Sequence, residues 1–259
     1  MSQLEAALRQ TASGPKVLGA WLEQNPEALT PQFVVEVKQY ASEAMQNGAG
    51  NAALTAHLLA ASIQIRIGDR AGFLGSQLNQ AEVMFMMADT SEAYEDPFNI
   101  ASGVIEKAQQ IDAIDKVFWA IGLASDCAYF SSETAQDSAT KEQWLVIAVD
   151  TLLRLEDVTP PKDAPGLWQR FVSVMVATYQ TIIQHPWQPD ISVMEPRLRR
   201  LAALAEKLIP GRFAFQDPQK TEHAVLHLSE LSKNYGSVAA AEARLKGSYQ
   251  VRKTEKWED

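Results

Sequence analysis

Residues 21–88 constrain the fold more than any other part of the chain, because they predict three helices joined by short turns. Thr30-Pro31 marks a helix start, since the threonine hydroxyl can cap the helix and proline suits its first position. The sequence NGAGN at 47–51 ends that helix, and Gly68-Asp69 ends the next one, over about 52–67. A third helix is expected over about 71–88. This stretch predicts stacked helices and carries no catalytic motif.

The helix predicted over about 52–67 is apolar on nearly every face, because alanine, leucine and isoleucine occupy most of its positions. A helix without a polar stripe is usually covered on more than one side. Its alanines also allow neighbouring backbones to approach closely. We therefore expect this helix to pack between other helices.

Helix pairing continues along the rest of the chain, with longer loops. The other helices are expected over about 2–11, 15–24, 98–111, 113–130, 141–156, 167–184, 191–209, 219–233 and 237–248. The loops between them are expected at 89–97, 131–140, 159–166, 185–190 and 210–218. The pairs begin near 52, 98, 141 and 191, a spacing typical of helical-pair arrays. No alternating run of β-branched residues predicts a strand.

The predicted fold class is therefore all-α. We expect a right-handed α-solenoid of antiparallel helix pairs, with closure into a compact helical bundle as the alternative. One all-helical domain is expected over residues 1–248, followed by a loosely ordered tail over 249–259.

The sequences NPEALTP at 25–31 and IGDRAGFLGSQLNQA at 67–81 carry a family resemblance. Together with the helices around them, they resemble the degenerate tetratricopeptide-like (TPR-like) helical arrays of bacteria, some of which precede caspase-like CHAT peptidase domains. Gly68-Asp69 matches the turn of such a repeat, and Ala61 matches the small residue before it. His57 and Gln64 stand where the repeat has aromatic residues, the alanine after the turn is one residue out of register, and no peptidase domain is recognised. The resemblance covers about 21–88 and implies a bacterial helical-repeat protein.

The charge of the chain limits its partners. The net charge of −9 argues against general binding to nucleic acids or anionic membranes. The acidic residues are concentrated in residues 81–160, which hold fifteen Asp/Glu and four Lys/Arg. We expect this acidic middle third to attract a basic protein or peptide. No secretory signal or membrane-spanning run is recognised, and the single cysteine, Cys127, fits a cytoplasmic protein.

Two groups of residues could bind metal or act as a nucleophile. His223, His227 and Glu230 share one face of a predicted helix, with Glu222 beside them, and could hold a transition metal. An ordinary half-exposed helix face is the favoured interpretation of that group. Cys127 lies in an apolar stripe, which favours a small core residue over a nucleophile.

Two further groups could bind partners. One is a basic group of Arg197, Arg199, Arg200, Lys207 and Arg212. Within it, Arg200, Lys207 and Arg197 could line a groove for an acidic peptide or a phosphate, although a solvated face is favoured. The apolar run 84–87 (Met-Phe-Met-Met) cannot face a single core. Stacking between two covered surfaces is the favoured interpretation of that run, with partial exposure to a partner as the alternative.

The sequence thus favours a non-catalytic protein–protein interaction module or scaffold with a helical-repeat groove. We assign no catalytic residue, no metal ligand and no cofactor. Two alternatives stay open: a metal-dependent helical enzyme with a site near His223 and His227, and a regulatory subunit of a separately encoded effector. The second alternative follows from the family resemblance alone.

Overall fold

The computed structural model describes residues 2–159 and Val174, together with positions 196, 197, 200, 201, 203, 204, 207 and 208. All regular elements in this part of the chain are helical, which confirms the all-α class, and no strand occurs among these residues. None of the helices described is long and apolar enough to cross a membrane. The chain divides into two compact units, Met1–Cys127 and Ala128–Asp259, so the expectation of one domain over 1–248 stays a prediction.

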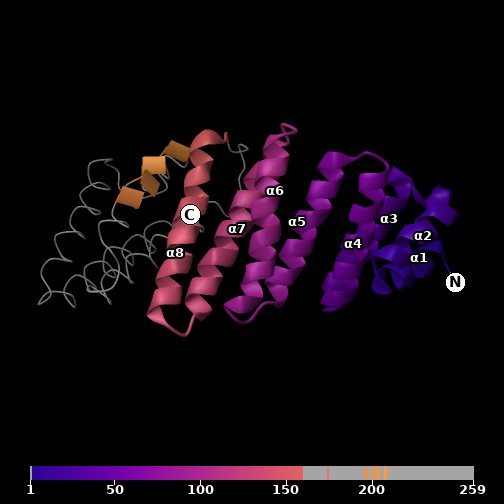
Figure 1. Cartoon of the computed structure of the whole chain (residues 1–259), viewed down its shortest axis with the longest axis horizontal. Coiled ribbons are helices and arrows are strands. Elements are labelled where there is room, and N and C mark those ends of the chain that lie inside the picture. The colour runs from indigo at the N-terminus through magenta and orange to yellow at the C-terminus, as the bar shows by residue number, and fades with distance from the viewer. Residues whose placement is uncertain are drawn as a thin grey trace, which may run out of the picture. The chain divides into compact units, whose positions relative to one another are not determined.

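Most helix contacts in the first unit join neighbours in sequence, and the contact of α1 with α4 is an exception (Figure 1). Helix α4 packs against α3 and α5, α5 packs against α6, and α1 packs against α2 and α4. The helices are α1 (Gln3–Ala12), α2 (Pro15–Gln24), α3 (Pro31–Gln46), α4 (Gly50–Arg66), α5 (Arg70–Met87), α6 (Glu95–Gln109) and the first part of α7 (Ile114–Thr134). Short 3-10 helices cover Pro26–Ala28 (η1) and Glu92–Tyr94 (η2).

The second unit begins within α7, whose last residues belong to it. Helix α8 (Ser138–Leu153) follows, and a 3-10 helix, η3 (Arg154–Asp157), continues directly from its end. Leu145, Leu152 and Leu155 are fully or almost fully buried in this unit. The helices expected over 219–233 and 237–248, and the tail over 249–259, lie outside the described residues, as does most of 167–184 and 191–209.

Local capping chemistry sets the ends of α3 and α4 where the sequence predicts them. The Thr30 hydroxyl accepts a hydrogen bond from the Phe33 amide at 3.2 Å, with Pro31 in the first helical position. Gly48 and Gly68 then end α3 and α4 in left-handed conformations, with φ of 71° and 78°. In both turns the amide after the glycine donates to the carbonyl five residues earlier, as in a Schellman motif: Ala49 donates to Ala44, and Asp69 donates to Gln64.

Helix α6 ends in the same motif, but an aspartate takes the place of glycine. Asp112 has a φ of 53°, the only positive value at a non-glycine residue in the described part of the chain. The Ala113 amide donates to the Ala108 carbonyl at 3.0 Å, and the Asp112 amide donates to the Gln109 carbonyl at 3.3 Å. The hydrogen bonds of the turn are therefore complete despite the less favourable backbone of Asp112.

Helix α4 packs between other helices, as its apolar sequence predicts. It contacts α1, α3 and α5, and Leu59 and Ile63 are fully buried. Leu58 and Ile65, seven residues apart, remain 48% and 59% exposed. The helix is thus covered on several sides and leaves one narrow apolar face open.

The loop expected at 89–97 is mostly helical, so that prediction is wrong in its extent. Glu92–Tyr94 forms η2, and α6 begins at Glu95. Pro97 lies in the first turn of α6, where a backbone amide has no partner within the helix. The missing N–H of proline therefore costs no helical hydrogen bond. The Tyr94 hydroxyl donates to the Ala88 carbonyl at 3.1 Å, which joins η2 to the end of α5.

The loop expected at 131–140 is also wrong in its extent, because α7 continues to Thr134 and α8 already begins at Ser138. Polar residues at the end of α7 satisfy their hydroxyls within the helix. Ser132 donates to the Tyr129 carbonyl at 2.6 Å, and Thr134 donates to the Phe130 carbonyl at 2.9 Å. Asp137 caps α8 by accepting a bond from the Thr140 amide at 2.8 Å.

Candidate functional site

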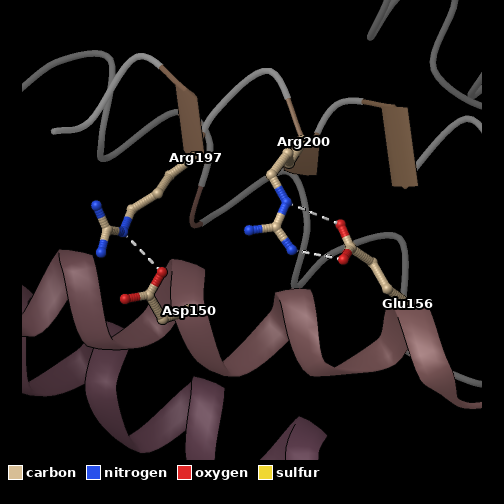
Figure 2. Close-up of polar contacts among 4 residues, drawn as sticks. All are labelled: Asp150, Glu156, Arg197 and Arg200. Carbon is tan, nitrogen blue, oxygen red and sulfur yellow. Dashed lines mark hydrogen bonds and ion pairs between the residues drawn. The ribbon is translucent and has the colours of Figure 1, made fainter. Parts of the chain in front are cut away.

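Two arginines of the basic group singled out in the sequence contact carboxylates of the second unit. The Arg197 Nε donates to Asp150 Oδ1 on α8 at 2.7 Å. The Arg200 guanidinium contacts both oxygens of Glu156 in η3, with Nε at 3.2 Å and Nη2 at 2.5 Å. Figure 2 shows both guanidiniums pointing toward this acidic face. The structure therefore joins members of the basic group to the acidic middle third of the same chain.

These pairs are charge-assisted and partly open to water. The hydrogen bond to Asp150 raises the pKa of Arg197, and the hydrogen bonds to Glu156 raise the pKa of Arg200. The Arg200 side chain stays 59% exposed, so water and salt screen its pair with Glu156. The groove for an acidic peptide stays a prediction, although Arg197 and Arg200 already hold carboxylates of their own chain. Lys207 is exposed, and Arg199 and Arg212 lie outside the described residues.

Other carboxylates of the acidic middle third lie at the surface of the first unit. Glu92, Glu95 and Asp96 are exposed where η2 passes into α6, and we call them the acidic turn. No ion pair or hydrogen bond of their side chains is found in the described part of the chain. Acidic side chains at this helix start also interact favourably with the positive end of the α6 dipole. The acidic turn combines this structural role with a surface that can receive a cation.

Cys127 is fully buried in α7. Burial raises the pKa of its thiol, and the neighbouring Asp126 raises it further. The thiolate needed for nucleophilic chemistry is therefore strongly disfavoured, which agrees with a small core residue.

The predicted metal group of Glu222, His223, His227 and Glu230 lies outside the described residues. Within the part of the chain that is described, no group of three or more His, Cys, Asp or Glu side chains could hold a metal ion. The metal-site hypothesis therefore stays a prediction.

The apolar run 84–87 divides between packing and exposure. The Phe85 ring lies 5.6 Å from the Tyr94 ring, between centroids, which joins the end of α5 to η2. Met86 and Met87 are 62% and 47% exposed. Stacking therefore accounts for part of the run, and the two exposed methionines add to the apolar surface of the first unit.

A polar network lies where α4 turns into α5, with Gln64 and Ser76 buried and Asp69 exposed. The Gln64 amide donates to Asp69 Oδ2 at 3.2 Å and accepts from the Ser76 hydroxyl at 2.5 Å. Asp69 Oδ1 caps α5 by accepting from the Gly72 amide at 2.8 Å. The network fixes the turn between two helices and leaves no side chain free for chemistry, so its role is structural.

Lys38 of α3 is a half-buried cation on which Asp69 of this network acts through space. Burial is the main cause that lowers its pKa, against the opposing effect of Asp69, and Lys116 of α7 lowers it further. Its ammonium makes no hydrogen bond or ion pair with the residues that the structure describes. A desolvated cation without a bonded carboxylate is unusual, because the charge loses its hydration.

His57 of α4 lies near Lys38 and is only 8% exposed. Burial lowers its pKa to about 4, with a smaller contribution from the charge of Lys38, so the ring is neutral at neutral pH. Its Nδ1 is buried without a hydrogen-bond partner. The sequence relates His57 to the repeat pattern and does not pair it with Lys38. The available signal was a pair of polar residues, His57 and Gln64, seven apart in an otherwise apolar helix.

The chain was also compared with known proteins. No family model matches it, and no match is found among the curated proteins or the solved structures. The function is therefore inferred from the geometry of the chain itself.

Proposed function

We propose that this chain is a non-catalytic protein–protein interaction module that receives a basic protein or peptide on its acidic middle third. One observation carries the proposal: Arg197 and Arg200, from a distant part of the sequence, bond to Asp150 and Glu156 of that region. The acidic surface thus binds guanidinium groups within its own chain. A partner with exposed arginine or lysine would meet the same chemistry at other carboxylates of the region.

The acidic turn offers such carboxylates in the first unit. Glu92, Glu95 and Asp96 are exposed and close together in sequence, so their charges add at one place on the surface. The exposed Met86 and Met87 precede this turn in the chain and supply apolar contact area. Charge would steer the encounter with a partner, and apolar burial would contribute most of the affinity.

The proposal includes an α-solenoid of antiparallel helix pairs, of the TPR-like kind that the sequence resembles. Packing between sequence neighbours from α3 to α6 supports it, because such arrays are built from nearest-neighbour contacts. Helices α4, α6 and α8 begin at Gly50, Glu95 and Ser138, two or three residues before the expected starts, so the expected spacing of the pairs persists. A closed bundle is the competing arrangement. The proposed setting is the bacterial cytoplasm.

Affinity purification of the tagged full chain from its own organism tests this function. Captures at low and at high salt are compared by quantitative mass spectrometry. The proposal expects a basic protein in stoichiometric amount at low salt and much less of it at high salt. Recovery of no stoichiometric partner from cells in which the chain is abundant would count against an interaction module.

A further inference from the structure

The two arginine contacts of the second unit form one matched arrangement. Arg197 and Arg200 are both helical and three positions apart, so their side chains leave the same side of a helix. Their guanidiniums reach Asp150 on α8 and Glu156 in η3, which continues directly from α8 (Figure 2). The spacing of the two arginines therefore fits the spacing of the two carboxylates.

The bound arginines neutralise this acidic face. The end of α8 and η3 together carry three carboxylates and one arginine of their own: Asp150, Glu156, Asp157 and Arg154. Arg197 and Arg200 add two positive charges. The face thus has no net charge while both are bound, and two negative charges in excess when both are displaced. Its attraction for a basic partner depends on where these two side chains lie.

The contacts can open without unfolding the segment that carries them. Leu201 and Leu204 follow the arginines in the chain and are buried, so apolar packing holds their backbone in place. The guanidiniums and the carboxylates that they contact are all partly exposed. Exposed ion pairs contribute little free energy, and competing ions weaken them. A competing cation therefore has to displace only two side chains.

We propose that Arg197 and Arg200 are internal competitors for the acidic face of Asp150 and Glu156, and that a partner helix with two arginines three positions apart takes their place. The carboxylates would accept the same charge-assisted hydrogen bonds from the guanidiniums of the partner. The released Arg197 and Arg200 would turn into water. This inference rests on the proposed function, because it specifies the arginine spacing of the basic partner and a face for it in the second unit.

Variants that release the acidic face test the competition. A fluorescent alanine-rich peptide with two Arg-Ala-Ala-Arg segments is titrated with the full chain at constant ionic strength, and its anisotropy is followed. The same peptide with glutamine in place of arginine is the reference and should not bind. Arg197→Met combined with Arg200→Met should raise the affinity for the arginine peptide by roughly threefold or more, since two exposed pairs no longer compete. Adding Asp150→Asn and Glu156→Gln should remove that gain.

A control with the same change in charge separates competition from net charge. Arg70→Met combined with Lys107→Met removes two exposed cations of the first unit and should have a much smaller effect on the affinity. Circular dichroism verifies that each variant is folded, and Arg200→Met alone carries the test if the double variant is not.

The outcomes distinguish this inference from the proposed function. Equal affinities of wild type and the released variant, or an equal gain in the charge control, would overturn the internal competition. Peptide binding that ignores Arg197 and Arg200 but is lost when the acidic turn is neutralised would leave the proposed function standing without this inference. Failure of every version to bind the arginine peptide would count against both.

Discussion

The Gln64 side chain, at the end of α4, bonds to Asp69, the N-cap of α5, at 3.2 Å. Gly72 lies against this bond, and an added Cβ there would collide with the Asp69 carboxylate and the Gln64 amide. Both groups are held by other hydrogen bonds, from the Gly72 amide to Asp69 and from Ser76 to Gln64. They cannot move aside without losing these bonds. The turn between α4 and α5 therefore requires a glycine inside the first turn of α5.

Gly72→Ala should destabilise the protein by about 1–3 kcal/mol, the usual range for overpacking. Gly103→Ala is the matched control, because Gly103 also lies in a helix but has no atom within 4 Å of an added Cβ. That control should stabilise the protein by about 0.5–1 kcal/mol through its better helix propensity. Urea unfolding followed by circular dichroism measures both. Equal effects of the two substitutions would contradict the account of this turn.

Asp112→Gly should stabilise the protein by up to about 1 kcal/mol, because glycine adopts the left-handed conformation without the side-chain clash. Gly68→Ala places a side chain on the left-handed backbone at the end of α4 and should destabilise the protein by about 1–2 kcal/mol. Thermal unfolding of the two variants shows the opposite signs. A lower melting temperature for Asp112→Gly would mean that the Asp112 side chain stabilises its turn by more than the backbone strain.

His57 should make the protein less stable in acid. The unfolded chain protonates this histidine near pH 6.5, whereas the folded chain does so only at about 4. Between these values the unfolded state binds more protons, so the free energy of unfolding falls as the pH falls, by up to about 1.4 kcal/mol per pH unit. Above pH 6.5 the group has no such effect. His57→Phe removes the titrating ring and places an aromatic residue at this repeat position. The free energy of unfolding of this variant should fall less as the pH is lowered. Urea midpoints across pH 4 to 7 give the comparison, and parallel curves would contradict the neutral buried ring.

The Arg200–Glu156 pair should contribute little to stability despite its good geometry. A double-mutant cycle with Arg200→Met and Glu156→Gln should give only a small coupling energy, and a smaller one in high salt. Arg200 and Asp157 interact only through space, so their cycle is the control and should give a coupling near zero. A large Arg200–Glu156 coupling that high salt does not weaken would show that the pair is far less hydrated than its exposure indicates.

The helix ends of the first unit could be predicted because their chemistry is local. Thr30, Gly48 and Gly68 act on residues within one turn, so the sequence contains both partners of each interaction. The extent of α7 could not be predicted from composition. Its last turn reads as a polar loop, yet Ser132 and Thr134 bond to carbonyls of their own helix. A serine-rich stretch is compatible with both structures, and the sequence pattern alone did not separate them.

The candidate sites depend on contacts between distant residues, which the sequence does not pair. Arg197 and Arg200 stood out as a basic group, but nothing in the sequence indicated that Asp150 and Glu156 would meet them. Lys38 and Lys116 are single lysines in separate helices, and nothing in the sequence indicated that the charge of one would act on the other. His57 and Gln64 could have been noticed as polar residues in an apolar helix. Only the structure shows that His57 Nδ1 lacks a hydrogen-bond partner, whereas the Gln64 side chain bonds to Asp69 and Ser76.

Quantitative capture with three versions of the chain tests the central claim most directly. The first is wild type, the second carries Glu92→Gln, Glu95→Gln and Asp96→Asn in the acidic turn, and the third carries Glu23→Gln, Glu36→Gln and Glu43→Gln at exposed positions outside the acidic third. The second and third remove the same number of charges, and thermal melts verify that all three are folded. We predict that wild type and the third version recover a basic partner in equal, stoichiometric amounts, and that the acidic-turn variant recovers much less. Equal recovery by all three versions would contradict binding through the acidic turn.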